Sequence, residues 1–136
     1  MDLDQARAFL RDNHRSVLAT SRSDGSPQMA PVLAAVDDQG RVVVSSREAA
    51  YKTKHLRKDP HAWLCAFPDG FYGDWVQVEG TVEVLSLPAA MEPLVEYYRT
   101  VNGEHPDWDE YRAAMIREER CLLRMTVERA GPDRSG

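Results

Sequence analysis

The clearest pattern in the chain is an alternation of apolar and polar residues over residues 74–85. Alternation with a period of two is typical of a strand with one face in the core and one face toward solvent. The core-facing set is Val76, Val78, Gly80, Val82 and Val84. The opposite face is polar except for Trp75, so this tryptophan calls for a role other than solvation.

Five further segments have the composition of strands: residues 16–21, 28–36, 41–45, 62–67 and 120–129. The first three are joined by two short turns, Asp24-Gly25 and residues 37–40, which predicts an antiparallel meander. Pro31 lies inside the second segment and therefore indicates an edge strand or a bulge there.

Four helices are predicted between these strands. The first covers residues 3–13, with Asp2 and Gln5 placed to form a capping box, and the second runs from a Ser46 cap to residue 58. The third covers residues 92–102, and the fourth begins at Asp107 with Glu110. We expect one mainly β domain over residues 1–129, a six-stranded antiparallel half-open barrel with helices at its ends, and a flexible tail at 130–136.

Charge is distributed unevenly along the chain. The net charge of the 136 residues is −5, which argues against a general nucleic-acid binder. Residues 47–58 nevertheless carry five basic side chains and one acid, so the remainder is strongly acidic. Such a basic segment is either a local anion site or a solvated helix face, and the residues alone leave both open. No apolar run is long enough to span a membrane, and the acidic N-terminus does not resemble a secretion signal, so we expect a cytoplasmic protein.

The usual catalytic signatures are absent from the sequence. It contains no dinucleotide-binding glycine motif, P-loop, nucleophile elbow or zinc-binding helix. Cys65 and Cys121 lie in apolar segments and are expected to be reduced core thiols, and the histidines are scattered, so no metal site is predicted. We assign no catalytic side chain, and Tyr72 is only a weak candidate proton donor. An enzyme of this kind would take its reactive group from a cofactor.

Four segments together resemble a known family. They are residues 16–32, residues 45–60 with their terminal Asp59-Pro60, the strand segment 75–81, and residues 98–112. Their order and spacing resemble the pyridoxamine 5'-phosphate oxidase-like superfamily. The last segment is similar to the actinobacterial branch that uses coenzyme F420, a deazaflavin.

The resemblance implies a split-barrel homodimer with its cofactor in a groove between the subunits. The phosphate would be held at the end of the third strand and the following helix, and the ring would lie along the second strand with Trp75 and Gln77 on its other side. The implied cofactor-binding residues are Gln28, Pro31, Val32, Ser45, Ser46, Arg47, Lys52, Trp75 and Gln77. The chain departs from relatives at His55 and Ala50, where they often carry Asn and Arg.

The function implied is hydride transfer between coenzyme F420 and an unsaturated small organic substrate. Lys54, Arg57 and Lys58 either meet the acidic tail of that coenzyme or are solvated. The alternatives are an FMN-dependent enzyme of the same fold and a non-catalytic cofactor- or tetrapyrrole-binding protein.

Overall fold

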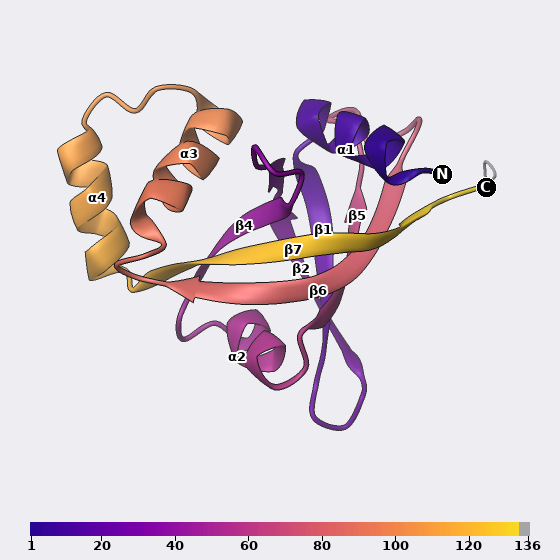
Figure 1. Cartoon of the computed structure of the whole chain (residues 1–136), viewed down its shortest axis with the longest axis horizontal. Coiled ribbons are helices and arrows are strands. Elements are labelled where there is room, and N and C mark those ends of the chain that lie inside the picture. Colours follow the sequence, from indigo (N-terminus) through magenta and orange to yellow (C-terminus); the bar gives the residue numbers. More distant parts are fainter. Residues whose placement is uncertain (134–136) are drawn as a thin grey trace.

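A single antiparallel sheet of seven strands forms the body of the molecule, and a computed structural model describes it for residues 1–133. The sheet curls into a half-barrel with the strand order β2-β1-β5-β6-β7-β4-β3 (Figure 1). The mainly β fold with four helices is as predicted. The elements in chain order are α1 (Leu3–Asp12), β1 (Arg15–Ser21), β2 (Pro27–Leu33), β3 (Ala35–Val36), β4 (Val42–Arg47), α2 (Tyr51–Lys58), β5 (His61–Ala66), β6 (Val76–Ser86), α3 (Met91–Asn102), α4 (Trp108–Arg117) and β7 (Arg120–Gly131).

The seventh strand arises because the predicted second strand divides in two. β2 pairs with β1 as far as Leu33, and β3 then pairs with β4 on the other side of the sheet. Between them the backbone N–H of Ala34 donates to the carbonyl of His14. The same stretch of chain therefore serves both ends of the sheet. β2 is an edge strand, as Pro31 indicated.

The pairing of β6 with β7 is the longest in the sheet and contains a bulge. The register shifts between Glu79 and Gly80, so that Gly80 lies opposite Val127 and Glu128 is the extra residue. The two backbones approach closely at this point. A Cβ on Gly80 would lie 1.9 Å from the carbonyl oxygen of Thr126, which only a glycine avoids.

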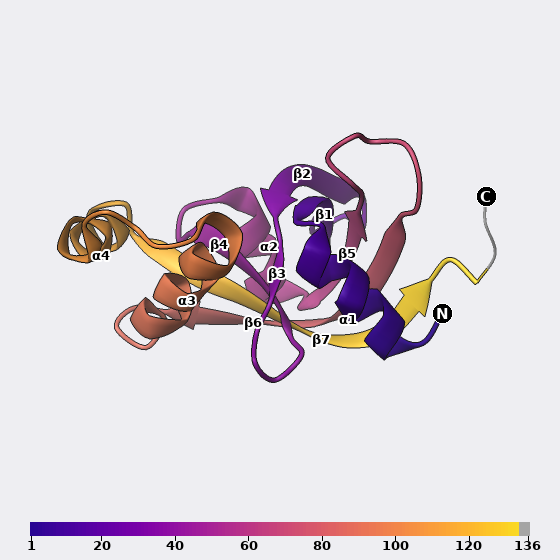
Figure 2. The same cartoon turned by 90° about the horizontal axis from the view of Figure 1, so that it is seen from above.

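Two hydrophobic clusters form on opposite faces of the sheet. The interior of the half-barrel is filled by the alternating residues of the strands, including the valines predicted on β6, and is covered by α1 and by Leu56 of α2. The second cluster lies outside, where α3 and α4 cover β3, β4 and β7 (Figure 2). Tyr111 and Met115 of α4 belong to it. Within residues 1–133, no residue of β1, β2 or β5 belongs to this outer cluster.

Most of the predicted caps and turns are confirmed. Asp2 and Gln5 form a complete capping box, and the carboxylate of Asp107 accepts from the N–H of Glu110. Gly25 and Gly40 adopt positive φ angles in the two turns. The predicted helix start at Ser46 is wrong, because Ser46 belongs to β4 and α2 begins only at Tyr51. β4 extends further than predicted because it pairs with β7 as far as Arg47.

Two further expectations need correction. β7 continues past Arg129 to Gly131, because Gln77 of β6 provides a partner for it there, and residues 134–136 of the expected tail lie outside the described residues. Cys121 is a buried thiol as predicted, but Cys65 is only partly buried, because it points to the outer face of β5.

None of the helices within residues 1–133 is long and apolar enough to cross a membrane.

The bulge makes a testable demand on Gly80. We expect Gly80→Ala to lower the free energy of unfolding by at least about 2 kcal/mol, because the new methyl group overlaps backbone and cannot move away. Urea denaturation at fixed protein concentration measures this. Gly70→Ala is the matched control, since a Cβ there has no neighbour within 4 Å. Equal stability of the two variants would contradict the close approach.

Candidate functional site

The half-barrel is open along one seam, between β2 at one end of the sheet and β4 near the other. The two strands lie close together without pairing. At the bottom of the seam the hydroxyl of Tyr97 on α3 donates to the carbonyl of Leu33 over 2.7 Å. We call this opening the split. It is the place where backbone polar groups of the sheet have no strand partner.

The register of β1 and β2 determines which backbone groups face the split. The N–H of Arg22 donates to Ser26 and that of Ala34 to His14, so the even-numbered residues of β2 bond to β1. The odd-numbered residues therefore direct their N–H and C=O groups into the split. Of the three β2 residues implied by the family resemblance, Pro31 faces the split with its carbonyl, whereas the backbones of Gln28 and Val32 are paired with β1. Met29 lies inside the implied segment of residues 28–32 but was not named as a binding residue; its backbone offers both a donor and an acceptor.

The side chain of Gln28 remains available in another way. It shares a face of the sheet with Thr20, whose hydroxyl lies 3.2 Å from Nδ1 of His55 on α2. Within residues 1–133 the buried Oε1 of Gln28 has no hydrogen-bond partner. Such an orphaned acceptor is costly unless a ligand or water donates to it. Val32, by contrast, packs against the interior cluster.

Three cations gather beside α2, at the point where β4 ends and β7 begins. Arg47 and Arg120 are opposite one another in the β4–β7 ladder, and Lys52 lies close enough to feel both charges. Arg120 had not been identified from the sequence, since only the pairing of distant strands brings it here. We refer to Arg47, Lys52 and Arg120 as the cation cluster.

One carboxylate partly neutralises the cation cluster. Oε1 of Glu118 lies 2.9 Å from Nη2 of Arg120 and 3.4 Å from Nη2 of Arg47. The hydrogen bond from Arg120 is the main reason that the pKa of Glu118 is below its usual range. Glu48, the other nearby acid, pairs instead with Arg57 over 2.7 Å. Three cations against one carboxylate leave a local charge of about +2, which favours an anionic ligand.

Lys52 is the least compensated member of the cluster. No carboxylate among residues 1–133 lies within ion-pair distance of its ammonium group. Partial burial, followed by the charges of Arg120 and Arg47, lowers the pKa of Lys52. A bound anion would relieve both effects, because it supplies the missing opposite charge. This is the behaviour expected of a binding residue rather than of a solvated helix face.

The two serines implied by the resemblance lie on opposite faces of the sheet. Ser46 is buried, and its hydroxyl lies 2.8 Å from that of Thr53 on α2, so it joins β4 to the helix and does not face a ligand. Ser45 points to the outer face of the sheet, and its hydroxyl has no partner within residues 1–133. Ser45 is therefore the serine available to the site.

Trp75 and Gln77 lie far from the cation cluster. Gln77 pairs with Gly131 at one end of the β6–β7 ladder, whereas Ser86 pairs with Cys121 at the other end, next to the cluster. The intervening strand is roughly 30 Å long at about 3.3 Å per residue. One chain therefore does not bring the two halves of the predicted site together. Tyr72, the weak candidate proton donor, is 87 % exposed in the loop before β6.

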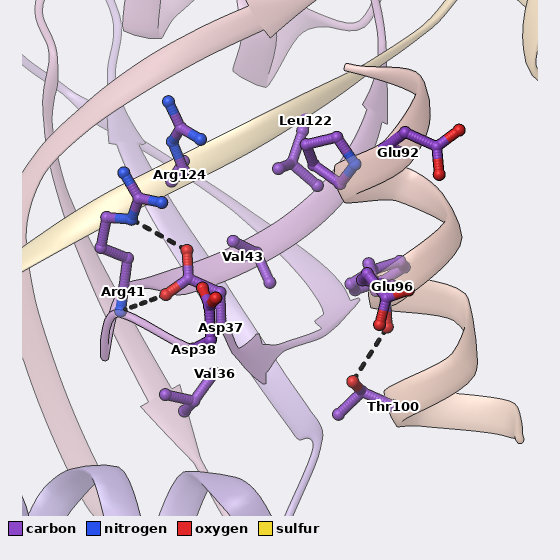
Figure 3. A pocket seen from close by; sticks show the side chains of 12 residues that line it. Val36, Asp37, Asp38, Arg41, Val43, Glu92, Glu96, Thr100, Leu122 and Arg124 are labelled. Carbon is purple, nitrogen blue, oxygen red and sulfur yellow. Dashed lines mark hydrogen bonds and ion pairs between the residues drawn. The ribbon is translucent and has the colours of Figure 1, made fainter. Parts of the chain in front are cut away.

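Two cavities flank α3. One, of about 540 Å³, lies between α3, α4 and the ends of β2 and β4, and both Ser45 and Arg120 line it. The other, of about 510 Å³, lies between α3 and the β3–β4 hairpin (Figure 3). In the second cavity Arg41 pairs with Asp37 over 2.8 Å (Figure 3). Its lining contains four carboxylates, Asp37, Asp38, Glu92 and Glu96, against two arginines, so the second cavity is the weaker anion site.

The uncompensated charge of Lys52 leads to a prediction about stability. A lysine whose pKa is lowered in the fold destabilises the fold while it is charged; this cost begins to fall as the pH rises past the lowered pKa and is gone above the usual pKa of lysine. At neutral pH we therefore expect Lys52→Met to raise Tm by a few degrees, and we expect sulfate to stabilise the wild-type protein but not this variant. Thermal melts with and without sulfate measure both. Lys58→Met, at an exposed position of the same helix, should change neither, and an unaltered sulfate response in Lys52→Met would refute the assignment.

Comparison with known proteins places this geometry in a family. Residues 3–131 match the family model described as pyridoxamine 5'-phosphate oxidase. The conserved hypothetical protein Rv2991 from Mycobacterium tuberculosis has a similar structure, with a TM-score of 0.78, 22 % identity, and coverage of 96 % of this chain and 82 % of that one.

Two further solved structures have the same fold. One described as an F420 reductase has a TM-score of 0.72 and 17 % identity, over 92 % of this chain and 94 % of that one. A putative pyridoxamine 5'-phosphate oxidase from Listeria innocua has a TM-score of 0.66 and 15 % identity, over 95 % of each chain. At these identities the structural likeness concerns the fold. Together with the family match over almost the whole sequence, it shows that the chain belongs to the pyridoxamine 5'-phosphate oxidase family of split-barrel proteins.

Proposed function

We propose that this protein is an oxidoreductase that uses coenzyme F420 to reduce an unsaturated small organic molecule. The observation that carries the proposal is the cation cluster beside the split, whose charge of about +2 lacks a counter-ion. The similarity in fold to an F420 reductase supports the choice of cofactor within the family.

The donors present in the chain fit the acidic part of such a cofactor. Lys52 offers a point charge and Arg47 offers a planar group of several donors. Glu118 competes with a bound anion for the guanidinium group of Arg47, so it limits affinity. Lys54 and Lys58 extend the positive surface along α2, where an acidic tail would lie.

The other residues of the split would position the ring and keep water away from it. Met29 and Pro31 present backbone groups toward it, and the Gln28 amide oxygen accepts one further hydrogen bond. When bound in its reduced form, the deazaflavin supplies a hydride, which adds two electrons and a proton to a carbon–carbon double bond, while water supplies the second proton. We assign no side chain to proton transfer. The contribution of the chain is binding and orientation.

FMN is the second candidate cofactor, and the matched family model favours it. The cation cluster does not distinguish the two, because both cofactors carry a phosphate group. FMN would make molecular oxygen a possible acceptor.

Parallel fluorescence titrations of coenzyme F420 and FMN test the cofactor. We expect F420 to bind with micromolar affinity or better and FMN at least about tenfold more weakly. Lys52→Met should weaken F420 binding by about tenfold or more, the size of one charge-assisted hydrogen bond. Glu118→Gln should strengthen it by removing the competing carboxylate, whereas Glu83→Gln, which removes an ion-paired carboxylate elsewhere, should not. If FMN binds more tightly than coenzyme F420, the proposed cofactor is wrong and FMN takes its place. If neither cofactor binds, the proposed function is wrong.

We further propose that the working form is a homodimer whose sites are shared. The outer face of the sheet carries Met29 of β2, which is 66 % exposed. Burying this side chain against a second copy removes apolar surface from water. A second copy is also the means by which Trp75 and Gln77 reach a cation cluster, since they lie too far from the cluster of their own chain.

Mixing two inactive variants tests the shared site. Lys52→Met and Trp75→Ala should each bind cofactor poorly as homodimers. When the two chains are refolded together, half of the dimers are mixed and each mixed dimer has one intact site, so about a quarter of the sites should recover. Titration of active sites measures the fraction. No recovery, or normal binding by Trp75→Ala alone, would mean that each site is built within one chain.

A further inference from the structure

We propose that the cavity between α3, α4 and the ends of β2 and β4 binds a second ligand, a planar aromatic or conjugated molecule with an anionic substituent. We call this cavity the trough. That the ligand is the substrate rests on the proposed function, but the binding itself does not. Of its lining residues only Ser45 was implied as a cofactor-binding residue by the family resemblance. The helices α3 and α4 are drawn in orange in Figures 1 and 2.

One wall of the trough is aromatic. Tyr98, His105, Trp108 and Tyr111 form a cluster in which every pair of ring centroids lies between 5.0 and 5.8 Å apart. The guanidinium of Arg99 covers the far side of Trp108, 4.8 Å from its centroid. Tyr98 and His105 remain partly exposed and line the trough. Their faces offer a planar ligand the stacking and edge contacts that aromatic rings prefer.

Some members of the aromatic cluster stabilise the packing of α3 and α4, whereas others are available to bind a ligand. Tyr111 is buried, its hydroxyl donates to the carbonyl of Leu94 over 2.8 Å, and burial raises its pKa to about 12. It fixes α4 against α3. The Tyr97 hydroxyl is likewise engaged by Leu33. In contrast, the Tyr98 hydroxyl has no partner within residues 1–133, so the side chain that lines the trough is also the one with a polar group to spare.

The other end of the trough is cationic. Arg120 lines it together with Ser45, and the rest of the cation cluster lies directly behind. Two carboxylates also line the trough, but Glu110 pairs with Arg117 over 3.1 Å and Glu118 is held by Arg120 and Arg47. The ends therefore call for different groups on one ligand: an aromatic ring at α3 and α4, and an anion at Arg120.

The trough has room for a ligand much larger than a simple inorganic anion. About 540 Å³ is within the range of small-molecule sites, roughly 300–1,000 Å³, and far larger than a sulfate ion requires. Ser45 and Arg120 join the trough to the cation cluster. Leu33, at the end of β2, also lines the trough, so a ligand there would lie beside the split as well as beside the cation cluster.

The test uses 2-naphthoate as the probe and the full chain labelled with 5-fluorotryptophan. Its three tryptophans give three ¹⁹F signals, which Trp→Phe variants assign. We expect 2-naphthoate to shift the Trp108 signal saturably and to leave those of Trp63 and Trp75 in place. Uncharged 2-naphthol and non-planar cyclohexanecarboxylate should each bind at least about tenfold more weakly, because each lacks one of the two features.

Two variants with matched controls locate the probe. Tyr98→Leu and Arg120→Gln should each weaken 2-naphthoate by about tenfold or more. Tyr72→Leu removes an exposed tyrosine of the loop before β6, and Arg11→Gln removes an exposed arginine of α1; both should bind as the wild-type protein does. A signal that shifts without saturation, equal binding of all three probes, or normal binding by Tyr98→Leu would overturn the proposal.

A repeat of the titration with saturating cofactor separates this inference from the proposed function. Unchanged or stronger 2-naphthoate binding in the presence of coenzyme F420 or FMN supports a second-ligand site. Competitive displacement overturns it, since the trough would then belong to the cofactor. If neither cofactor binds but 2-naphthoate does, the proposed function fails while the trough stands.

Discussion

The close pairing of β6 with β7 is the constraint on which the rest of the structure depends. These two strands run the length of the sheet, and their bulge at Gly80 turns a flat ladder into a curved one. β5 pairs with the free edge of β6 and β4 with the free edge of β7, so the β6–β7 pair joins the two halves of the sheet. The same two strands contribute to the interior cluster, and β7 also supports α3 and α4 outside.

The cation cluster is a consequence of how that ribbon ends. β7 starts immediately after α4, and its first residue, Arg120, is opposite the last residue of β4. Like charges are thus placed side by side by backbone pairing rather than by mutual attraction. The fold tolerates the repulsion because Glu118 bridges the two arginines. Lys52 has no such relief, which is the usual mark of a group kept for binding at some expense of stability.

The sequence predicted local features well and distant ones poorly. The alternation in β6, the Asp2 and Asp107 caps and the edge position of Pro31 depend on neighbours in the chain, and all were foreseen. The Ser46 cap was wrong because pairing with β7 extended β4 beyond its local signal. Arg120 was missed for the same reason: no local pattern marks a residue whose significance comes from a strand far along the chain. The large distance between Lys52 and Trp75 likewise became known only from the register of β6 with β7.

The two prolines of β2 have a consequence for how molecules can meet. Pro27 and Pro31 stand at positions whose backbone points away from β1, where any other residue would present an N–H. An incoming strand finds only part of the donor row that it needs to extend the sheet, and edge-to-edge polymerisation is discouraged. The prolines thus disfavour the edge as a route for strand addition, and the seam stays free for molecules too small to be strands.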